Sequence, residues 1–194
     1  MLSGVCRIQE EIVMKIWIKR ILLSIAALLA LSTAVLGFLS SRPGADELRG
    51  SVEINKPSAD VWAFLEEPEK LKSWVGWMKE IREATPGSRG VGSRQVWVME
   101  DMNNGGALME INGEVIAYRP GRSKTVRINV PGVFTGETEY SVEDLGGGRS
   151  RFSQNSKYAF ANSFTKLLTP IIMPSASKKG KEDMQRLKNK VEAQ

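Results

Sequence analysis

The pattern of hydrophobic and polar positions separates an N-terminal apolar run from a longer region of mixed character. Residues 21–39 read ILLSIAALLALSTAVLGFL and contain no charged side chain. As an α-helix that rises about 1.5 Å per residue, this run would span about 28 Å, close to the hydrocarbon thickness of a bilayer. Trp17 lies just before the run, where aromatic residues often mark a membrane interface. The pattern predicts a transmembrane helix over residues 21–39, after a flank of residues 1–20.

Two other interpretations of the apolar run stay open. The hydrophobic stretch of a cleaved signal peptide is usually about 7–15 residues long and ends in small residues at the cleavage site. This run is longer, and no clear Ala-x-Ala follows it. A buried core helix would normally show one apolar face, whereas no face is distinguished here. The prediction of an anchor is the same whether the chain starts at Met1 or at Met14.

The charges that flank the run predict its orientation. Four basic residues lie within residues 1–20, against Arg42 and Arg49 at a comparable distance after the run. Because cytoplasmic flanks carry an excess of Lys and Arg, we expect the N-terminus in the cytoplasm and the rest of the chain outside it. Residues 40–48, polar and with a Pro-Gly pair, then form a linker.

Beyond the linker, the hydrophobic period changes from helical to extended. Helices are expected over Ser58–Glu66 and Glu69–Trp74, each preceded by a proline start signal. From Met78 onward the period falls to about two, the spacing of β-strands. Strands are expected over residues 48–55, 78–84, 92–100, 107–118, 124–130, 135–144 and 149–160. The short turns between consecutive strands indicate an antiparallel sheet.

The C-terminal segment, residues 162–193, is predicted to be helical. Pro170 and Pro174 interrupt its first half, where we expect a kink or a break. Met184, Leu187 and Val191 lie three or four residues apart and predict a buried stripe on the second half. A run of strands flanked by helices is typical of the α+β class. The length of the chain favours one such domain, over residues 49–194.

The charge of the chain is uneven and gives little support to nucleic-acid binding. The 27 basic and 22 acidic residues give a net charge of +5. Residues 1–45 contribute three of these positive charges, so the rest of the chain carries only +2. A nucleic-acid-binding domain would normally carry a strongly basic face. We therefore expect no nucleic-acid partner.

A single cysteine, Cys6, and the lack of histidine exclude several kinds of catalytic site. Zinc sites built on His and Cys, Ser-His-Asp triads and Cys-His pairs cannot form. Acid–base chemistry would have to use carboxylates, Lys, Tyr or water. The glycine run Gly146–Gly148 lacks the Lys-Ser/Thr of a phosphate-binding loop. We assign no catalytic residue, no metal ligand and no cofactor.

Strand alternation divides the expected sheet into a charged face and an apolar face. The charged face, which we expect to be solvated, collects Arg94, Glu110, Asn112, Glu114, Arg127, Glu137, Glu139, Arg151 and Lys157. The apolar face has no assigned carboxylate or lysine, and its polar groups are two tyrosines, Gln154 and Ser156. The residues on it that we predict to bind a ligand are Trp97, Met99, Met109, Ile111, Tyr140, Phe152 and Tyr158.

The apolar face has two interpretations. A small-molecule site is typically apolar with a few polar groups, but the same residue types also make up a filled core. The basic run at Lys178, Lys179 and Lys181 is expected on a solvated helix face, with contact to anionic lipid headgroups as the alternative.

The order of the elements and several short motifs resemble the START-like (SRPBCC) superfamily. The motifs are INKPSADVWAFL at residues 54–65, Pro68, Leu71, Trp74, Gly92-Ser93, Glu114-Val115 and residues 187–192. This superfamily includes polyketide cyclase/dehydrase-like proteins, pollen-allergen-like proteins and lipid-transfer domains. The resemblance implies a helix-grip fold, in which a long C-terminal helix packs across a curved antiparallel sheet. It also implies that residues 162–173 roof an apolar cavity.

Three functions are compatible with these features. The leading one is a membrane-tethered module that binds a lipid-like or other hydrophobic small molecule. The second is an enzyme similar to polyketide cyclases and dehydratases that acts in the same cavity. The third is a structural or partner-binding domain with a filled core. The sequence identifies neither the ligand nor the oligomeric state.

Overall fold

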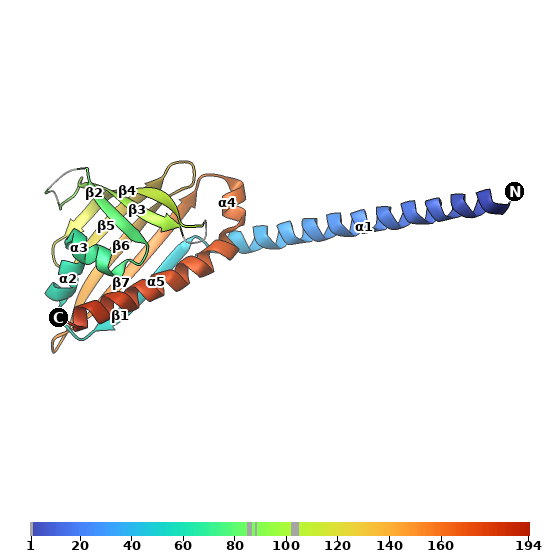
Figure 1. Cartoon of the computed structure of the whole chain (residues 1–194). Coiled ribbons are helices and arrows are strands. Elements are labelled where there is room, and N and C mark those ends of the chain that lie inside the picture. Colours follow the sequence, from blue (N-terminus) through green and yellow to red (C-terminus); the bar gives the residue numbers. More distant parts are fainter. Residues whose placement is uncertain (1, 85–86, 88, 102–104) are drawn as a thin grey trace.

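The computed structural model describes residues 2–84, 87, 89–101 and 105–194. The fold is α+β: helix α5 (Thr169–Glu192) lies across one curved antiparallel sheet, and helix α1 (Leu2–Ser40) projects away from this domain (Figure 1). Helix α5 begins beside the end of α1 and runs toward the opposite end of the domain (Figure 1). The predicted fold class, including the long C-terminal helix, is confirmed.

Helix α1 is long and apolar enough to cross a membrane. Its segment Met14–Ser40 has 27 residues and a mean hydropathy of 2.4, and its apolar stretch is not buried by the domain except near its C-terminal end. The predicted run, residues 21–39, lies inside this segment. The hydroxyls of Ser32 and Thr33 donate to backbone carbonyls one turn earlier, at 2.8 and 2.9 Å. Such bonds satisfy polar groups without water, as an apolar environment requires.

The sheet contains seven antiparallel strands in the order β1-β7-β6-β5-β4-β3-β2. Their bounds are β1 Glu47–Ile54, β2 Met78–Glu83, β3 Arg94–Asp101, β4 Ala107–Arg119, β5 Ser123–Val130, β6 Phe134–Gly146 and β7 Arg149–Phe160. Strands β2 to β7 follow one another as a meander, since each expected turn joins neighbours. The first strand pairs with the last, so β1 forms one edge of the sheet and β2 the other.

The helices begin and end where the local sequence provides the signals. Besides α1 and α5 they are α2 Ser58–Glu66, α3 Pro68–Trp74 and α4 Ser163–Leu167. The side chain of Asn162 caps α4 by accepting the N–H of Thr165 at 2.8 Å. The helical segment is interrupted at Leu168, between α4 and α5. Pro170 then lies in the first turn of α5, where proline is tolerated. The expected break is therefore observed, whereas Pro174 lies inside α5 without ending it.

The core consists of two clusters of buried residues. The first core cluster lies between α2, α3, α5 and strands β1, β6 and β7 (Ile54, Val61, Trp62, Phe64, Leu65, Trp74, Val142, Phe152, Met184, Leu187 and Val191). It includes the expected stripe of α5. The second core cluster lies on strands β3, β4 and β5 (Met99, Ile111, Val126, Ile128 and Val130). Several partly buried side chains pack around it, and Tyr140 contacts both clusters.

The strand register confirms the division into two faces. On the inner face, which faces α5, Trp97 is opposite Ile111 and Met99 is opposite Met109. On the outer face, oppositely charged residues from neighbouring strands pair across the sheet. These pairs include Arg127 with Glu137 at 3.1 Å, and Arg151 with Glu53 at 2.8 Å and Glu143 at 3.0 Å. Because they are exposed to water, such pairs contribute little to stability and mainly keep this face solvated.

Candidate ligand-binding site

Four of the predicted ligand-binding residues gather on the inner face of β3 and β4. Met99 and Ile111 are each 9% exposed and belong to the second core cluster. Trp97 and Met109 pack against this cluster but are only partly buried. The indole N–H of Trp97 is satisfied by the side-chain oxygen of Gln95 at 3.1 Å. The structure thus brings these four side chains together, as strand pairing predicts.

The other three predicted residues lie on β6 and β7. The ring of Tyr158 meets Phe134 edge to face at a centroid distance of 5.5 Å, and it packs on the second core cluster. Tyr140 stacks on Phe152 at 6.3 Å and joins the two clusters. Phe152 itself is fully buried in the first core cluster, beneath Trp74 at 5.9 Å. Tyr140 therefore lies between Phe152 and the other five predicted residues.

A short polar network crosses the same face. The Thr138 hydroxyl hydrogen-bonds the Ser156 hydroxyl at 2.9 Å, and the amide of Gln154 donates to Ser156 at 3.4 Å. Burial raises the pKa of Tyr158, and bonds to Ser156 and Thr138 oppose this shift in part. Burial also raises the pKa of Tyr140, and the nearby Tyr158 and the carboxylate of Asp183 raise it further. Both phenols therefore stay protonated at neutral pH and can donate hydrogen bonds rather than act as bases.

One expectation about the inner face is wrong. It does carry a lysine, because Lys124 alternates with Val126 and is opposite Tyr140. Lys124 lies near the start of the interior strand β5, where its ammonium pairs with Glu66 at 3.2 Å and donates to the carbonyl of Leu65. Burial lowers the pKa of Lys124, and the Glu66 carboxylate opposes this shift. The lysine thus caps the C-terminal end of α2 with a nearly buried ion pair, a structural role that strand alternation alone does not indicate.

Helix α5 adds two charged side chains that the strand analysis missed. Asp183 accepts the backbone N–H of Gly76 at 3.1 Å and the indole N–H of Trp77 at 3.4 Å, and it pairs with Arg186. One turn earlier, the ammonium of Lys179 lies over the ring of Trp77, 3.9 Å from its centroid. Lys179, Asp183 and Leu187 are four residues apart, so helical spacing could have indicated their common face.

Helix α5 approaches the sheet mainly at the β1 edge. A Cβ atom on Gly50 of β1 would lie 2.6 Å from the Cε of Met184, so a larger residue here would require the methionine side chain to shift. Since α5 packs chiefly on β1 and α3, the inner face of β3–β5 lies farther from the helix. Trp97, Met109 and Tyr158 are partly buried in that region, and a ligand held there would complete their burial.

A family model with the description "Polyketide cyclase / dehydrase and lipid transport" matches residues 46–192. The chain belongs to this polyketide cyclase/dehydrase family. The match covers the sheet and helices α2–α5 and leaves out α1, and it confirms the resemblance to the START-like superfamily. No curated protein matches the chain significantly.

Several solved structures share this fold. The Zhui aromatase/cyclase from Streptomyces sp. R1128 is 12% identical, with a TM-score of 0.62 over 75% of this chain and 93% of that one. The protein TTHA0849 from Thermus thermophilus is 17% identical, with a TM-score of 0.62 over 76% and 97%. Ara h 8.0201 is 10% identical, with a TM-score of 0.60 over 76% and 98%. At these identities the likeness establishes the helix-grip fold alone.

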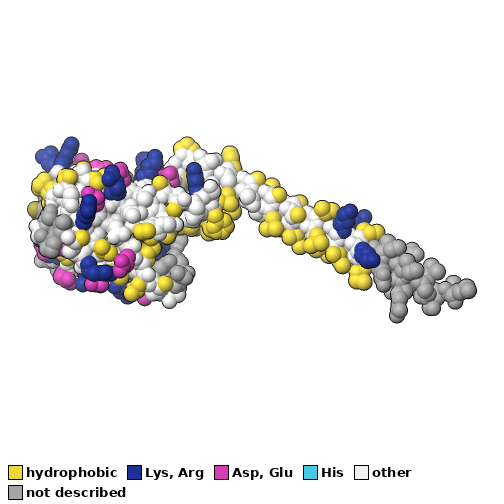
Figure 2. Space-filling view, turned by 90° about the horizontal axis from the view of Figure 1, so that it is seen from above, with side chains coloured by type: hydrophobic (Ala, Val, Ile, Leu, Met, Phe, Trp, Pro, Cys, Tyr) yellow, Lys and Arg dark blue, Asp and Glu magenta, His cyan; other side chains and the backbone are white. Residues whose placement is uncertain are grey.

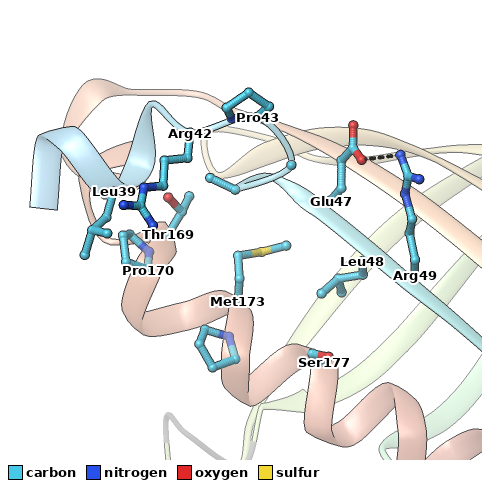
Figure 3. Close-up of a pocket in the computed structure, with 13 residues that line it drawn as sticks. Leu39, Arg42, Pro43, Glu47, Leu48, Arg49, Thr169, Pro170, Met173 and Ser177 are labelled. Carbon is cyan, nitrogen blue, oxygen red and sulfur yellow. Dashed lines mark hydrogen bonds and ion pairs between the residues drawn. The ribbon is translucent and has the colours of Figure 1, made fainter.

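This family member also has a groove where α1 meets the domain. The groove has a volume of about 990 Å³ and lies between the end of α1, the start of β1 and the first half of α5 (Figure 3). Its lining residues include Leu39, Arg42, Leu48, Pro170 and Met173. Figure 3 shows the side chains of Leu48 and Met173 pointing into the space between β1 and α5. The groove is largely apolar, and its charged lining residues are Arg42, Glu47 and Arg49.

Exposed hydrophobic side chains surround this groove. Phe164 of α4 is 70% exposed, and Ile171 and Ile172 at the start of α5 are 61% and 41% exposed. Figure 2 shows hydrophobic side chains gathered where α1 joins the domain and along α1 itself. The segment 162–173 is expected from the sequence to be buried as the roof of the cavity, but it is partly exposed. It comprises α4 and the first turn of α5, which lie next to α1 rather than over the middle of the sheet.

Proposed function

We propose that this protein is a membrane-tethered module that binds a lipid-like or other hydrophobic small molecule on the inner face of its sheet. The observation that carries the proposal is the partial burial of Trp97, Met109 and Tyr158, which point to the inside of the domain and not to its outer surface. Their apolar surface is the kind that a ligand would cover. The hydroxyls of Tyr140 and Tyr158 supply nearby hydrogen-bond donors, and the membership in a family with lipid-transport members agrees with this reading.

The tether is supported by α1 and by the surface at its end. Helix α1 offers an unburied apolar span, and the exposed side chains of α4 and α5 adjoin that span. A domain held in this way would present its groove to the bilayer surface, from which an apolar ligand could enter. Tethering also raises the effective concentration of the domain near a membrane-dissolved ligand. On the basis of the flanking charges, we propose that the domain lies outside the cytoplasm.

Catalysis like that of a polyketide cyclase is the second candidate for the same space. The description of the family favours this candidate. The lack of a catalytic motif does not argue against it, because such enzymes can act largely by positioning the substrate in a shaped cavity. The two inner tyrosines support binding more directly, because their raised pKa values make them donors and unfit as bases near neutral pH.

Binding can be tested by filling the proposed site at Met109. We expect Met109→Trp to weaken the binding of 11-(dansylamino)undecanoic acid at least about tenfold, because the larger ring would cover the apolar surface that the probe would contact. The stability of the domain should change by less than about 1 kcal/mol, since Met109 is only partly buried. The measurement is dansyl fluorescence with the full-length chain in nanodiscs, corrected for empty nanodiscs.

The neighbouring residue provides a matched control. Leu108 lies on the outer face and is 67% exposed, so Leu108→Trp adds the same ring without entering the site and should leave binding unchanged. If Met109→Trp instead costs about 1–3 kcal/mol of stability, and the wild-type chain binds no probe, the inner face is a packed core. That result would favour a structural role for the domain.

A further inference from the structure

Lys179 places a buried positive charge at the proposed site. Its ammonium has no hydrogen-bond partner among the residues that the structure describes. Its neighbours in the basic run, Lys178 and Lys181, are exposed. The expectation that all three lysines lie on a solvated face is therefore wrong for Lys179, which turns inward over Trp77.

The carboxylate of Asp183 on the same helix does not pair with this ammonium. Asp183 lies one turn away, but its oxygens already accept from Gly76, Trp77 and Arg186. The contact with the Trp77 ring is a cation–π interaction, which compensates only part of the loss of water around an ammonium. Burying a charge without a partner costs free energy, and proteins usually keep such a charge only where another group pairs with it.

The ammonium also lies at the proposed ligand site. Trp77 packs against the second core cluster together with Trp97 and Met109, so the cation over its ring borders the same partly buried region. A molecule whose apolar part lay against Trp97 and Met109 could therefore reach Lys179 with a charged end.

We infer that the ligand is an amphipathic acid, with an apolar body and one anionic group such as a carboxylate, and that Lys179 binds this anionic group. The inference rests on the proposed function and deepens it. The ammonium supplies a hydrogen bond between two charged groups and Coulomb attraction in a region of low dielectric constant, whereas an uncharged ligand of the same shape offers only a neutral acceptor and no net charge. This requirement selects acids, the class that includes fatty acids, over neutral lipids.

The test compares an acid with its neutral analogue. The full-length chain in nanodiscs is titrated with 11-(dansylamino)undecanoic acid and with its primary amide. We expect the wild-type chain to bind both, and the acid about 10- to 100-fold more tightly than the amide, as a hydrogen bond to a charged group implies. Lys179→Met should remove this preference, because it weakens the binding of the acid much more than that of the amide. Lys179→Arg should retain a preference for the acid.

Lys178→Met is the matched control, because it removes an exposed positive charge from the preceding position and should leave the preference intact. Thermal unfolding separates binding from folding: Lys179→Met should melt at the wild-type temperature or above it, since it removes an unpaired buried charge. Equal binding of acid and amide by the wild-type chain would overturn the inference and leave the proposed function standing. The inference would also be overturned if Lys179→Met kept the preference for the acid, whether or not its melting temperature fell below that of the wild-type chain. Binding of neither probe would overturn both.

Discussion

The full-length chain is expected to stay in the membrane fraction after high-salt and alkaline washing, whereas a chain that begins at Ala45 is expected to be soluble. The span Met14–Ser40 has a mean hydropathy of 2.4, and the domain covers only its C-terminal end. Insertion of such a helix is effectively irreversible, and neither wash weakens hydrophobic contacts with the bilayer. Both core clusters consist of residues 54–191, so the shortened chain keeps them whole.

Fractionation followed by immunoblotting measures this difference. Nearly all of the full-length chain should be in the membrane fraction, and nearly all of the shortened chain in the soluble fraction. The shortened chain controls for peripheral binding through Phe164 and Ile171. Release of intact full-length protein by either wash would contradict a transmembrane anchor. A mature N-terminus near Ser40 would show instead that the run is a cleaved signal peptide.

The second large effect is expected at Phe152. We expect Phe152→Ala to lower the free energy of unfolding by about 3–5 kcal/mol, as for other large-to-small changes in packed cores. Phe152 has no exposed surface; its ring meets Trp74 edge to face and stacks with Tyr140. In a domain of this size the change corresponds to a fall in melting temperature of roughly 10 °C.

Phe164→Ala is the control, because the same side chain is removed from a position that is 70% exposed and should cost less than about 0.5 kcal/mol. Urea denaturation of the full-length chain in nanodiscs, followed by circular dichroism, measures both variants. A loss below about 1 kcal/mol for Phe152→Ala would mean that open space surrounds this ring. Phe152 would then be a ligand contact, as the sequence predicts, rather than a core residue.

The sequence by itself determined the fold class, the apolar span and the two faces of the sheet. Each of these depends on local periodicity. A strand has only two faces, so the alternation that places Trp97 and Met99 together also places Arg127 and Glu137 together on the other side. The break before α5 was equally local, because proline cannot donate the backbone hydrogen bond that a helix interior requires.

Only the tertiary structure decided what each face meets. Alternation put Phe152 and Met109 on one face, but the position of α5 along the β1 edge buries Phe152 under Trp74 and leaves Met109 partly open. The same placement turns Lys179 over Trp77 and away from water, although Lys178 and Lys181 beside it are exposed. The groove at the end of α1 joins residues 39–49 to residues 169–177. Periodicity fixes the direction of a side chain within its own element, whereas burial and pairing depend on a second element far away in the chain.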